Sequence, residues 1–226
     1  MIPFKKSKSA LQDLLAIMAA LRSPEGCPWD KEQTHLTLRT HAVEEVYELM
    51  DAIEAGDDHE MLEELGDLLL QVVFHAQLAR ERGAFDFEQI ARAQAEKLLR
   101  RHPHVFGDSD AKTVDEVWAQ WDKIKKAEKQ GTHRERTSAF DGIPKHLPAL
   151  LRAEKLAKKA RKAKLLESRK TPRLSEKKLG EELFQLAEYA QSKGWSAEDL
   201  LRAELNKREK RWRKQEAKSV SHKPPG

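Results

Sequence analysis

The chain has 226 residues, of which 35% are charged, 39% hydrophobic and 6% aromatic. This composition favours a helical protein over a sheet protein, because sheets are enriched in β-branched and aromatic residues. No apolar run approaches the roughly 20 residues needed to span a bilayer, and none after Met1 is typical of a signal peptide. With Cys27 as the one cysteine, we expect a soluble protein of the reducing cytoplasm.

The net charge of +4 hides a difference between the two halves. Residues 1–150 carry 20 Lys/Arg and 27 Asp/Glu, whereas residues 151–226 carry 22 Lys/Arg and 11 Asp/Glu. An acidic front half and a basic rear half suggest two units with different roles or different histories.

Helical spacing of apolar residues and terminal signals predict five helices in the catalytic region that we assign to residues 1–130. A first helix is expected from Leu11 to Leu21, ending in a structured loop that contains two prolines and a glycine. The others are expected over 36–55, from Asp57 or Asp58 to Gly83, over 85–101, and from a Thr113–Glu116 capping box past Ile124.

The rear half is predicted to form a second, shorter helical unit over residues 149–218. A polar segment, 131–148, connects it to the first unit, and helices are expected over 149–166, 176–193 and 196–216. Residues 169–173 read as a basic linker, and residues 219–226 as a disordered tail.

Four carboxylates on two neighbouring helices are the strongest chemical signal. Glu45 and Glu48 share one face of their helix, as do Glu64 and Asp67 on the next, because residues three apart lie one turn from each other. A short turn near Gly56 makes the two helices antiparallel neighbours, so the two acidic pairs can face each other. Solvated helix acids are the plain alternative in a chain with 38 Asp/Glu.

Converging carboxylates repel one another unless a cation neutralises them. A site made only of oxygen ligands suits Mg²⁺, with Mn²⁺ as a substitute, and such sites commonly act on phosphates. These residues therefore predict a magnesium site.

The pattern Glu44-Glu45-x-x-Glu48 followed by Glu64-x-x-Asp67 resembles the metal-binding signature of the MazG nucleoside triphosphate pyrophosphohydrolases. The similarity is close over about residues 10–160. It extends to the segments 27–34, 66–74, 100–106 and 141–150. MazG proteins belong to an all-α superfamily, and the resemblance implies a helical bundle that forms a homodimer.

By this resemblance Glu45, Glu48, Glu64 and Asp67 match the metal ligands. Lys97 and Arg101, four apart on one helix, match the basic pair that binds the triphosphate. Trp121 and Lys125 match a Trp-x-x-x-Lys element that closes over the nucleotide. Basic side chains suit phosphate oxygens and an indole face suits a base, although packing in the core explains Trp121 equally well.

A weak internal repeat links the two halves. Glu63-Glu-Leu-Gly-Asp-Leu-Leu-Leu is echoed by Lys177-Lys-Leu-Gly-Glu-Glu-Leu-Phe, and Lys97 with Arg101 is echoed by Lys207 with Arg211. The acids are not kept, and the segment that would hold a second Glu-Glu-x-x-Glu is missing. We therefore expect a degenerate repeat that binds no catalytic metal.

The expected activity is Mg²⁺-dependent hydrolysis of a nucleoside triphosphate to the monophosphate and pyrophosphate, in the upkeep or regulation of the nucleotide pool. One acid, with Glu45 as a candidate, orients or deprotonates the attacking water. One alternative is a non-enzymatic nucleic-acid-binding protein that uses the basic rear half. Another is a di-iron bundle, for which Glu32-x-x-His35 is the single matching motif.

Overall fold

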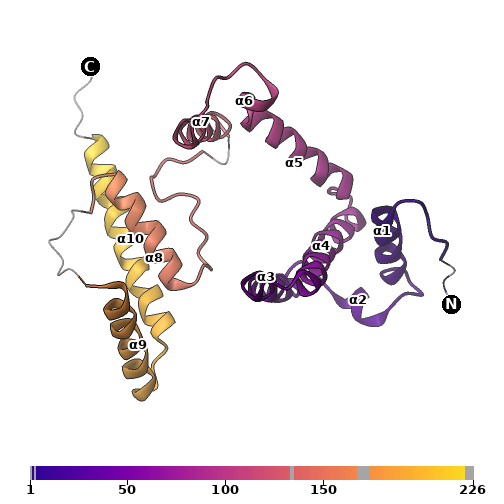
Figure 1. Cartoon of the computed structure of the whole chain (residues 1–226), viewed down its shortest axis with the longest axis horizontal. Helices are drawn as coiled ribbons and strands as arrows, with labels where there is room; N and C mark the ends of the chain where they lie inside the picture. The colour runs from indigo at the N-terminus through magenta and orange to yellow at the C-terminus, as the bar shows by residue number, and fades with distance from the viewer. Residues whose placement is uncertain (1, 3, 133–134, 167–173, 222–226) are drawn as a thin grey trace. The chain divides into compact units, whose positions relative to one another are not determined.

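The computed structural model describes residues 2, 4–132, 135–166 and 174–221, and in these it contains ten α-helices and no strand. The predicted all-α class is confirmed. The helices are α1 (Ala10–Leu21), α2 (Pro28–Glu32), α3 (Leu38–Ala55), α4 (Asp58–Glu81), α5 (Phe87–Arg101), α6 (Pro103–Phe106), α7 (Val114–Ala127), α8 (Ala149–Lys162), α9 (Glu176–Ser192) and α10 (Ala197–Ser221) (Figure 1).

The chain divides into two compact units, Met1–Val117 and Trp118–Gly226. The boundary falls within α7, upstream of the polar segment 131–148 that the sequence marks as the connection. The linker predicted at 169–173 and the end of the predicted tail, 222–226, lie outside the described residues; α10 itself continues to Ser221.

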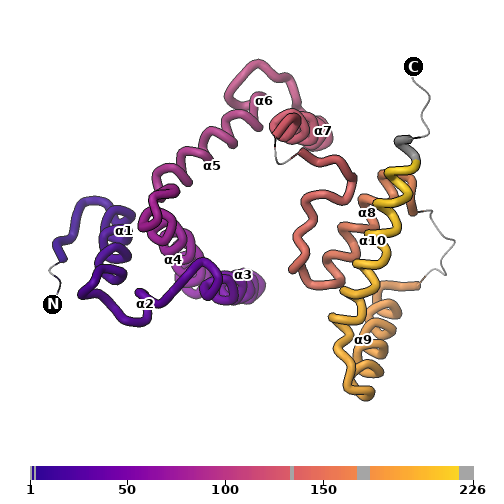
Figure 2. Tube along the Cα trace, turned by 180° about the vertical axis from the view of Figure 1, so that it is seen from behind, coloured from indigo at the N-terminus to yellow at the C-terminus, as the bar shows by residue number. Residues whose placement is uncertain are grey.

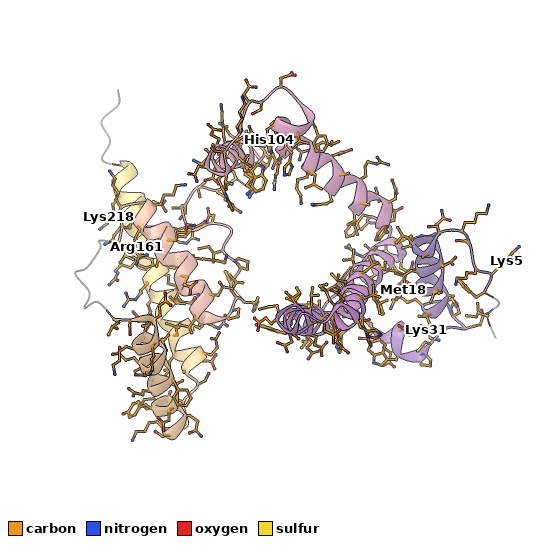
Figure 3. The ribbon with its side chains drawn as sticks, viewed as in Figure 1. Lys5, Met18, Lys31, His104, Arg161 and Lys218 are labelled. Carbon is orange, nitrogen blue, oxygen red and sulfur yellow. The ribbon has the colours of Figure 1, made fainter. Side chains whose placement is uncertain are left out.

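The core of the first unit lies where α1 meets the second half of α4. Met18, which is labelled in Figure 3, is 2% exposed, and it packs with Val73 and Phe74 of α4 and with Leu38 at the start of α3. These side chains recur at helical spacing, so each helix buries one stripe against the other. The core anchors α4, the longest helix of this unit.

A tight turn joins α3 to α4 and makes them antiparallel neighbours, which Figure 2 shows side by side. Gly56 closes α3 in the left-handed conformation (φ 67°), which a residue with a Cβ rarely adopts. The Asp57 carboxylate then accepts hydrogen bonds from the backbone N–H groups of His59 and Glu60 and caps α4. The turn therefore fixes how the acidic faces of the two helices meet.

Two capping boxes are present, of which the one at Thr113 and Glu116 was predicted from the sequence. Asp86 and Gln89 form a reciprocal capping box at the start of α5, at 2.9 and 3.0 Å. At the start of α7, Glu116 accepts from the backbone N–H of Thr113 at 3.0 Å, and its own N–H donates to the Thr113 hydroxyl. Each box satisfies amide groups that the first helical turn leaves without partners.

Three elements depart from the sequence prediction. The structured loop after α1 contains the five-residue helix α2, with Pro28 at its first turn, where a proline suits a helix. Pro103 likewise starts α6 directly after α5. Helix α8 ends at Lys162 rather than near 166, because Lys164 takes a left-handed conformation (φ 56°) and turns the chain.

The second unit is built on α8 and α10, which pack along each other. Phe140 stacks on Trp212 with ring centroids 5.7 Å apart, and Leu156 and Leu205 complete the buried cluster. The buried Arg152 donates to Glu209 at 2.6 Å, so its charge is paired.

None of the helices in the described ranges combines the length and the apolar character that crossing a membrane requires.

Candidate active site

The α3–α4 hairpin brings three of the four predicted acids together. One carboxylate oxygen from each of Glu45, Glu48 and Glu64 lies within 4.8 Å of the others. Glu45 and Glu64 are half-buried, whereas Glu48 is exposed. Asp67 lies outside this trio, one turn beyond Glu64 on α4, and it acts on Glu45 and Glu64 through its charge.

The cluster is electrostatically strained. The pKa of Glu45 is raised above its ordinary value by burial first, and then by the charges of Asp67 and Glu48. The pKa of Glu64 is raised in the same way, by burial and by the charges of Glu48, Asp67, Glu45 and Glu63. Each carboxylate therefore disfavours ionisation of the next, which is the condition under which a bound cation is most strongly stabilised.

Gln71 belongs to this centre although sequence reasoning gave it no role. It is 8% exposed and lies one turn beyond Asp67 on α4, and its amide N–H donates to Glu45 Oε1 at 3.4 Å. The Gln71 amide oxygen is buried and has no hydrogen-bond partner among the described residues. Its spacing of four residues from Asp67 was the available signal.

The residues present fit a hard divalent cation. The trio offers only carboxylate oxygens, which Mg²⁺ and Mn²⁺ prefer. Glu64 Oε2 is buried and accepts no hydrogen bond from the part of the chain that the structure describes. A buried, unsatisfied anionic oxygen is costly, and coordination to a metal would satisfy it.

The predicted basic pair lies on α5, in the same unit as the acids. Lys97 and Arg101 are one turn apart, both half-buried, near the C-terminal end of the helix. Residues four apart share a helical face, so the two side chains can act on one ligand.

Trp121 and Lys125 lie on α7, in the second unit. The Lys125 ammonium sits 5.4 Å from the centre of the Trp121 ring, and Trp118 meets the same ring edge-on at 5.6 Å. The Trp-x-x-x-Lys pair therefore forms one cation–π contact on a single helix.

The rear repeat shows no acidic cluster in the part of it that the structure describes. At the positions that correspond to Glu64 and Asp67, Lys178 and Glu181 form an ion pair at 3.8 Å on α9. No group of three acids, histidines or cysteines with metal-ligand spacing occurs in the described residues of the second unit.

The histidine of the di-iron alternative is engaged elsewhere. His35 Nδ1 lies 2.8 Å from His75 Nδ1, and the two rings are stacked. Burial, and then the nearby His35, lower the pKa of His75, which favours its neutral form. The pair is a packing contact beside α4 and not part of the acid trio.

The fold and the site together define an all-α protein with an acidic centre on a helical hairpin. Residues 33–106, which include the four acids and the basic pair, match the model of the MazG nucleotide pyrophosphohydrolase domain.

Two relatives show how far the similarity extends. The chain is 53% identical over 147 residues to a nucleoside triphosphate pyrophosphohydrolase of Escherichia coli, a match that covers 65% of this chain and 55% of the relative. It is 40% identical over 230 residues to the nucleoside triphosphate pyrophosphohydrolase/pyrophosphatase MazG of Thermotoga maritima, a match that covers 94% of this chain and 88% of that relative. The chain thus spans about half the length of the E. coli relative. It belongs to the MazG nucleotide pyrophosphohydrolase family.

Proposed function

We propose that this chain hydrolyses nucleoside triphosphates to the monophosphate and pyrophosphate, with Mg²⁺ held by Glu45, Glu48, Glu64 and Asp67. The observation that carries the proposal is the trio of carboxylates within 4.8 Å, of which Glu64 has a buried oxygen without a partner. The names of the E. coli and T. maritima relatives support the same reaction. Mn²⁺ is the expected substitute, because it accepts the same ligands.

In the proposed reaction, residues of the acidic centre have distinct roles. When bound, the metal supplies charge neutralisation for the phosphate oxygens and lowers the pKa of water. Glu45 is our candidate for the group that orients the attacking water and takes its proton, because its half-buried carboxylate lies within the acid trio. Gln71 holds Glu45 through their hydrogen bond.

Basic and aromatic side chains bind the rest of the substrate. Lys97 and Arg101 stabilise the negative charge that develops on the departing pyrophosphate. Trp121 offers an indole face to the base and Lys125 a charge to the phosphates, as their cation–π pair on α7 permits.

The decisive experiment measures pyrophosphate release from a panel of ribo- and deoxyribonucleoside triphosphates, with Mg²⁺, with Mn²⁺ and with a chelator. We expect turnover only when a metal is present. The ranking of substrates would indicate whether the enzyme clears unwanted nucleotides or adjusts the pool of common ones. Turnover that persists in excess chelator would contradict the proposed metal centre.

We also propose that the first unit forms a homodimer through α3 and α4. Both helices expose large apolar side chains beside the acids, namely Val46, Tyr47, Met50, Ile53, Leu62, Leu65, Leu69 and Val72. Many exposed apolar side chains on two neighbouring helices support an association site. Light scattering across a range of concentrations should give twice the chain mass, and a monomer mass at every concentration would exclude this dimer.

A further inference from the structure

The second unit contains a cavity of about 560 Å³, and one residue of its lining, Lys125, is also assigned to the substrate in the proposed reaction. It is bordered by the end of α7, by residues 129–130 and 135–139, and by α8. Six basic residues line it, namely Lys125, Lys126, Lys129, Arg136, Lys159 and Lys162. Its volume lies within the range of about 300–1,000 Å³ that is typical of small-molecule sites.

The acidic residues of the lining offset part of this charge. Among the described lining residues, Asp122 and Glu135 are acidic, which leaves an excess of four positive charges from the six basic residues. Asp122 pairs with Lys162 at 3.3 Å, and Glu135 accepts from the backbone N–H of Gly131 at 3.1 Å. The cavity is therefore positive as a whole, and an anionic ligand is the complementary occupant.

Two of the cations are held in position by the backbone around residue 142. The Arg136 guanidinium packs so closely on Gly142 that a Cβ at that position would fall 2.1 Å from Nη2. Lys159 Nζ donates to the Asp141 carbonyl at 2.8 Å. Fixed donors lose less conformational entropy when they bind a ligand than mobile surface lysines do.

The charges in this region also repel one another. Burial lowers the pKa of Lys159 below its ordinary value, and the charges of Arg136, Arg213 and Lys129 lower it further, while Asp141 acts against them. An anion bound between these groups would relieve the repulsion.

We propose that this cavity binds a small ligand that carries two or more linked phosphate groups. Pyrophosphate and the polyphosphate tail of a nucleotide share this chemistry. A cavity of this size lined by several cations favours such a ligand over a nucleic-acid strand, which requires an extended track. The second unit has no acid trio among its described residues, so the ligand is bound there without being hydrolysed.

The test is calorimetric titration of the full chain in excess chelator, which removes metal-dependent binding at the acidic centre. All titrations use a chain that carries Lys97→Ala, because this substitution weakens the basic pair on α5 and so reduces phosphate binding there. Pyrophosphate, ATP and inorganic phosphate are titrated separately. Comparison of pyrophosphate with ATP shows whether the cavity prefers free pyrophosphate or the polyphosphate tail of a nucleotide. We expect pyrophosphate or ATP to bind more tightly than inorganic phosphate, and to bind less tightly as salt rises.

The added substitutions are Lys159→Met and Lys126→Glu, with Lys158→Met as the matched control. Lys158 is the exposed neighbour of Lys159 on α8 and does not line the cavity. Each cavity variant should weaken binding by about tenfold, the effect of one charge-assisted contact, and the control should not. Lys126 is exposed, so its replacement keeps the test valid if Lys159→Met does not fold.

Absence of binding, or equal weakening by the control, would overturn the proposal. The proposal would also be overturned if the chain bound an RNA oligonucleotide but bound neither pyrophosphate nor ATP. Because the titration needs no turnover, its failure is separate from failure of the pyrophosphate-release assay.

Discussion

Glu48 is the exposed member of the acid trio, and its charge raises the pKa of both Glu45 and Glu64. An acid whose pKa is higher in the folded state destabilises the fold once the pH rises above its unfolded value, because the folded state then resists ionisation. The metal-free chain should therefore lose stability between acidic and neutral pH. A bound cation should reverse this loss.

The variant Glu48→Gln separates these effects. It removes one charge, so we expect the metal-free chain to unfold at a slightly higher temperature at pH 7 and at an unchanged temperature near pH 4. Turnover should fall by on the order of 100-fold or more, since several kcal/mol of charge stabilisation are lost. Thermal unfolding and pyrophosphate release measure the two quantities.

Glu54→Gln is the matched control, because Glu54 is an exposed acid on the same helix outside the trio. It should keep both stability and turnover. Full activity in Glu48→Gln would remove this residue from the site.

Lys97 gives a second prediction at the scale of a single residue. If its contact is to the β/γ end of the substrate, Lys97→Ala should weaken triphosphate binding by about 10- to 100-fold and monophosphate binding much less. Arg92→Ala, an exposed cation on the same helix, serves as the control. Equal losses for the two nucleotides would point to a structural role for Lys97.

One ion pair links the end of α1 to the end of α4 in the first unit. Arg22, whose side chain is 8% exposed, binds Glu81 with two hydrogen bonds of 2.7 Å, and it also donates to the backbone carbonyls of Asp30 and Gln33. Its guanidinium lies 5.6 Å from the centre of the Phe74 ring. Arg22 thus ties α2 and the loop after it to the core.

This pair predicts sensitivity to acid. The hydrogen bond from Arg22 holds the pKa of Glu81 below the ordinary value of 4.5. The ion pair therefore stabilises the fold above pH 4.5, and this stabilisation is lost as the pH falls through the lowered pKa of Glu81. Glu81→Gln should cost about 1 kcal/mol at pH 7, since Glu81 is partly exposed, and less near pH 3. Urea unfolding at both values measures the difference.

The control is Glu88→Gln, which breaks an exposed pair with Arg92 on α5. Such pairs contribute little, so this variant should match the wild-type chain at both pH values. A penalty for Glu81→Gln that does not depend on pH would show that packing, rather than charge, explains the role of Glu81.

At the same scale, the sequence predicted the long helices better than the short ones. The convergence of the acids was predictable because the turn between their helices has local sequence signals. Gly56 is a typical helix-ending residue and Asp57 a typical helix-capping residue. Helices α2 and α6 were not predicted, because five and four residues are too few to show a period. Gln71 was missed because its spacing from Asp67, the one available signal, does not reveal its burial or its contact with Glu45 on the other helix.

At the scale of the whole molecule, the degenerate repeat predicts that catalysis is confined to the front half of the chain. A fragment of residues 1–130 keeps the acids, the basic pair and all of α7, so it should retain measurable pyrophosphate release. A fragment of residues 145–226 keeps Lys207 and Arg211 but lacks an acid trio among its described residues, so it should show none. Because the second fragment omits Phe140, which stacks on Trp212, a fragment of residues 135–226 that keeps Phe140 is the matched control, and circular dichroism of both should report folded helices.

Activity in the rear fragment would contradict our interpretation of the repeat as degenerate. Loss of activity in the front fragment, with its helices intact, would instead assign the rear unit a part in the reaction.

The mutual repulsion of the acids on α3 and α4 has a consequence for how the protein tolerates heat. A ligand that binds only the folded state raises the free energy of unfolding by RT ln(1 + [L]/Kd), and a carboxylate cluster assembled by a turn hardly exists in the unfolded chain. With the proposed metal in place, the melting temperature is therefore a function of free divalent cation. Cells depleted of magnesium would hold less of this protein in its folded form before any substrate is considered.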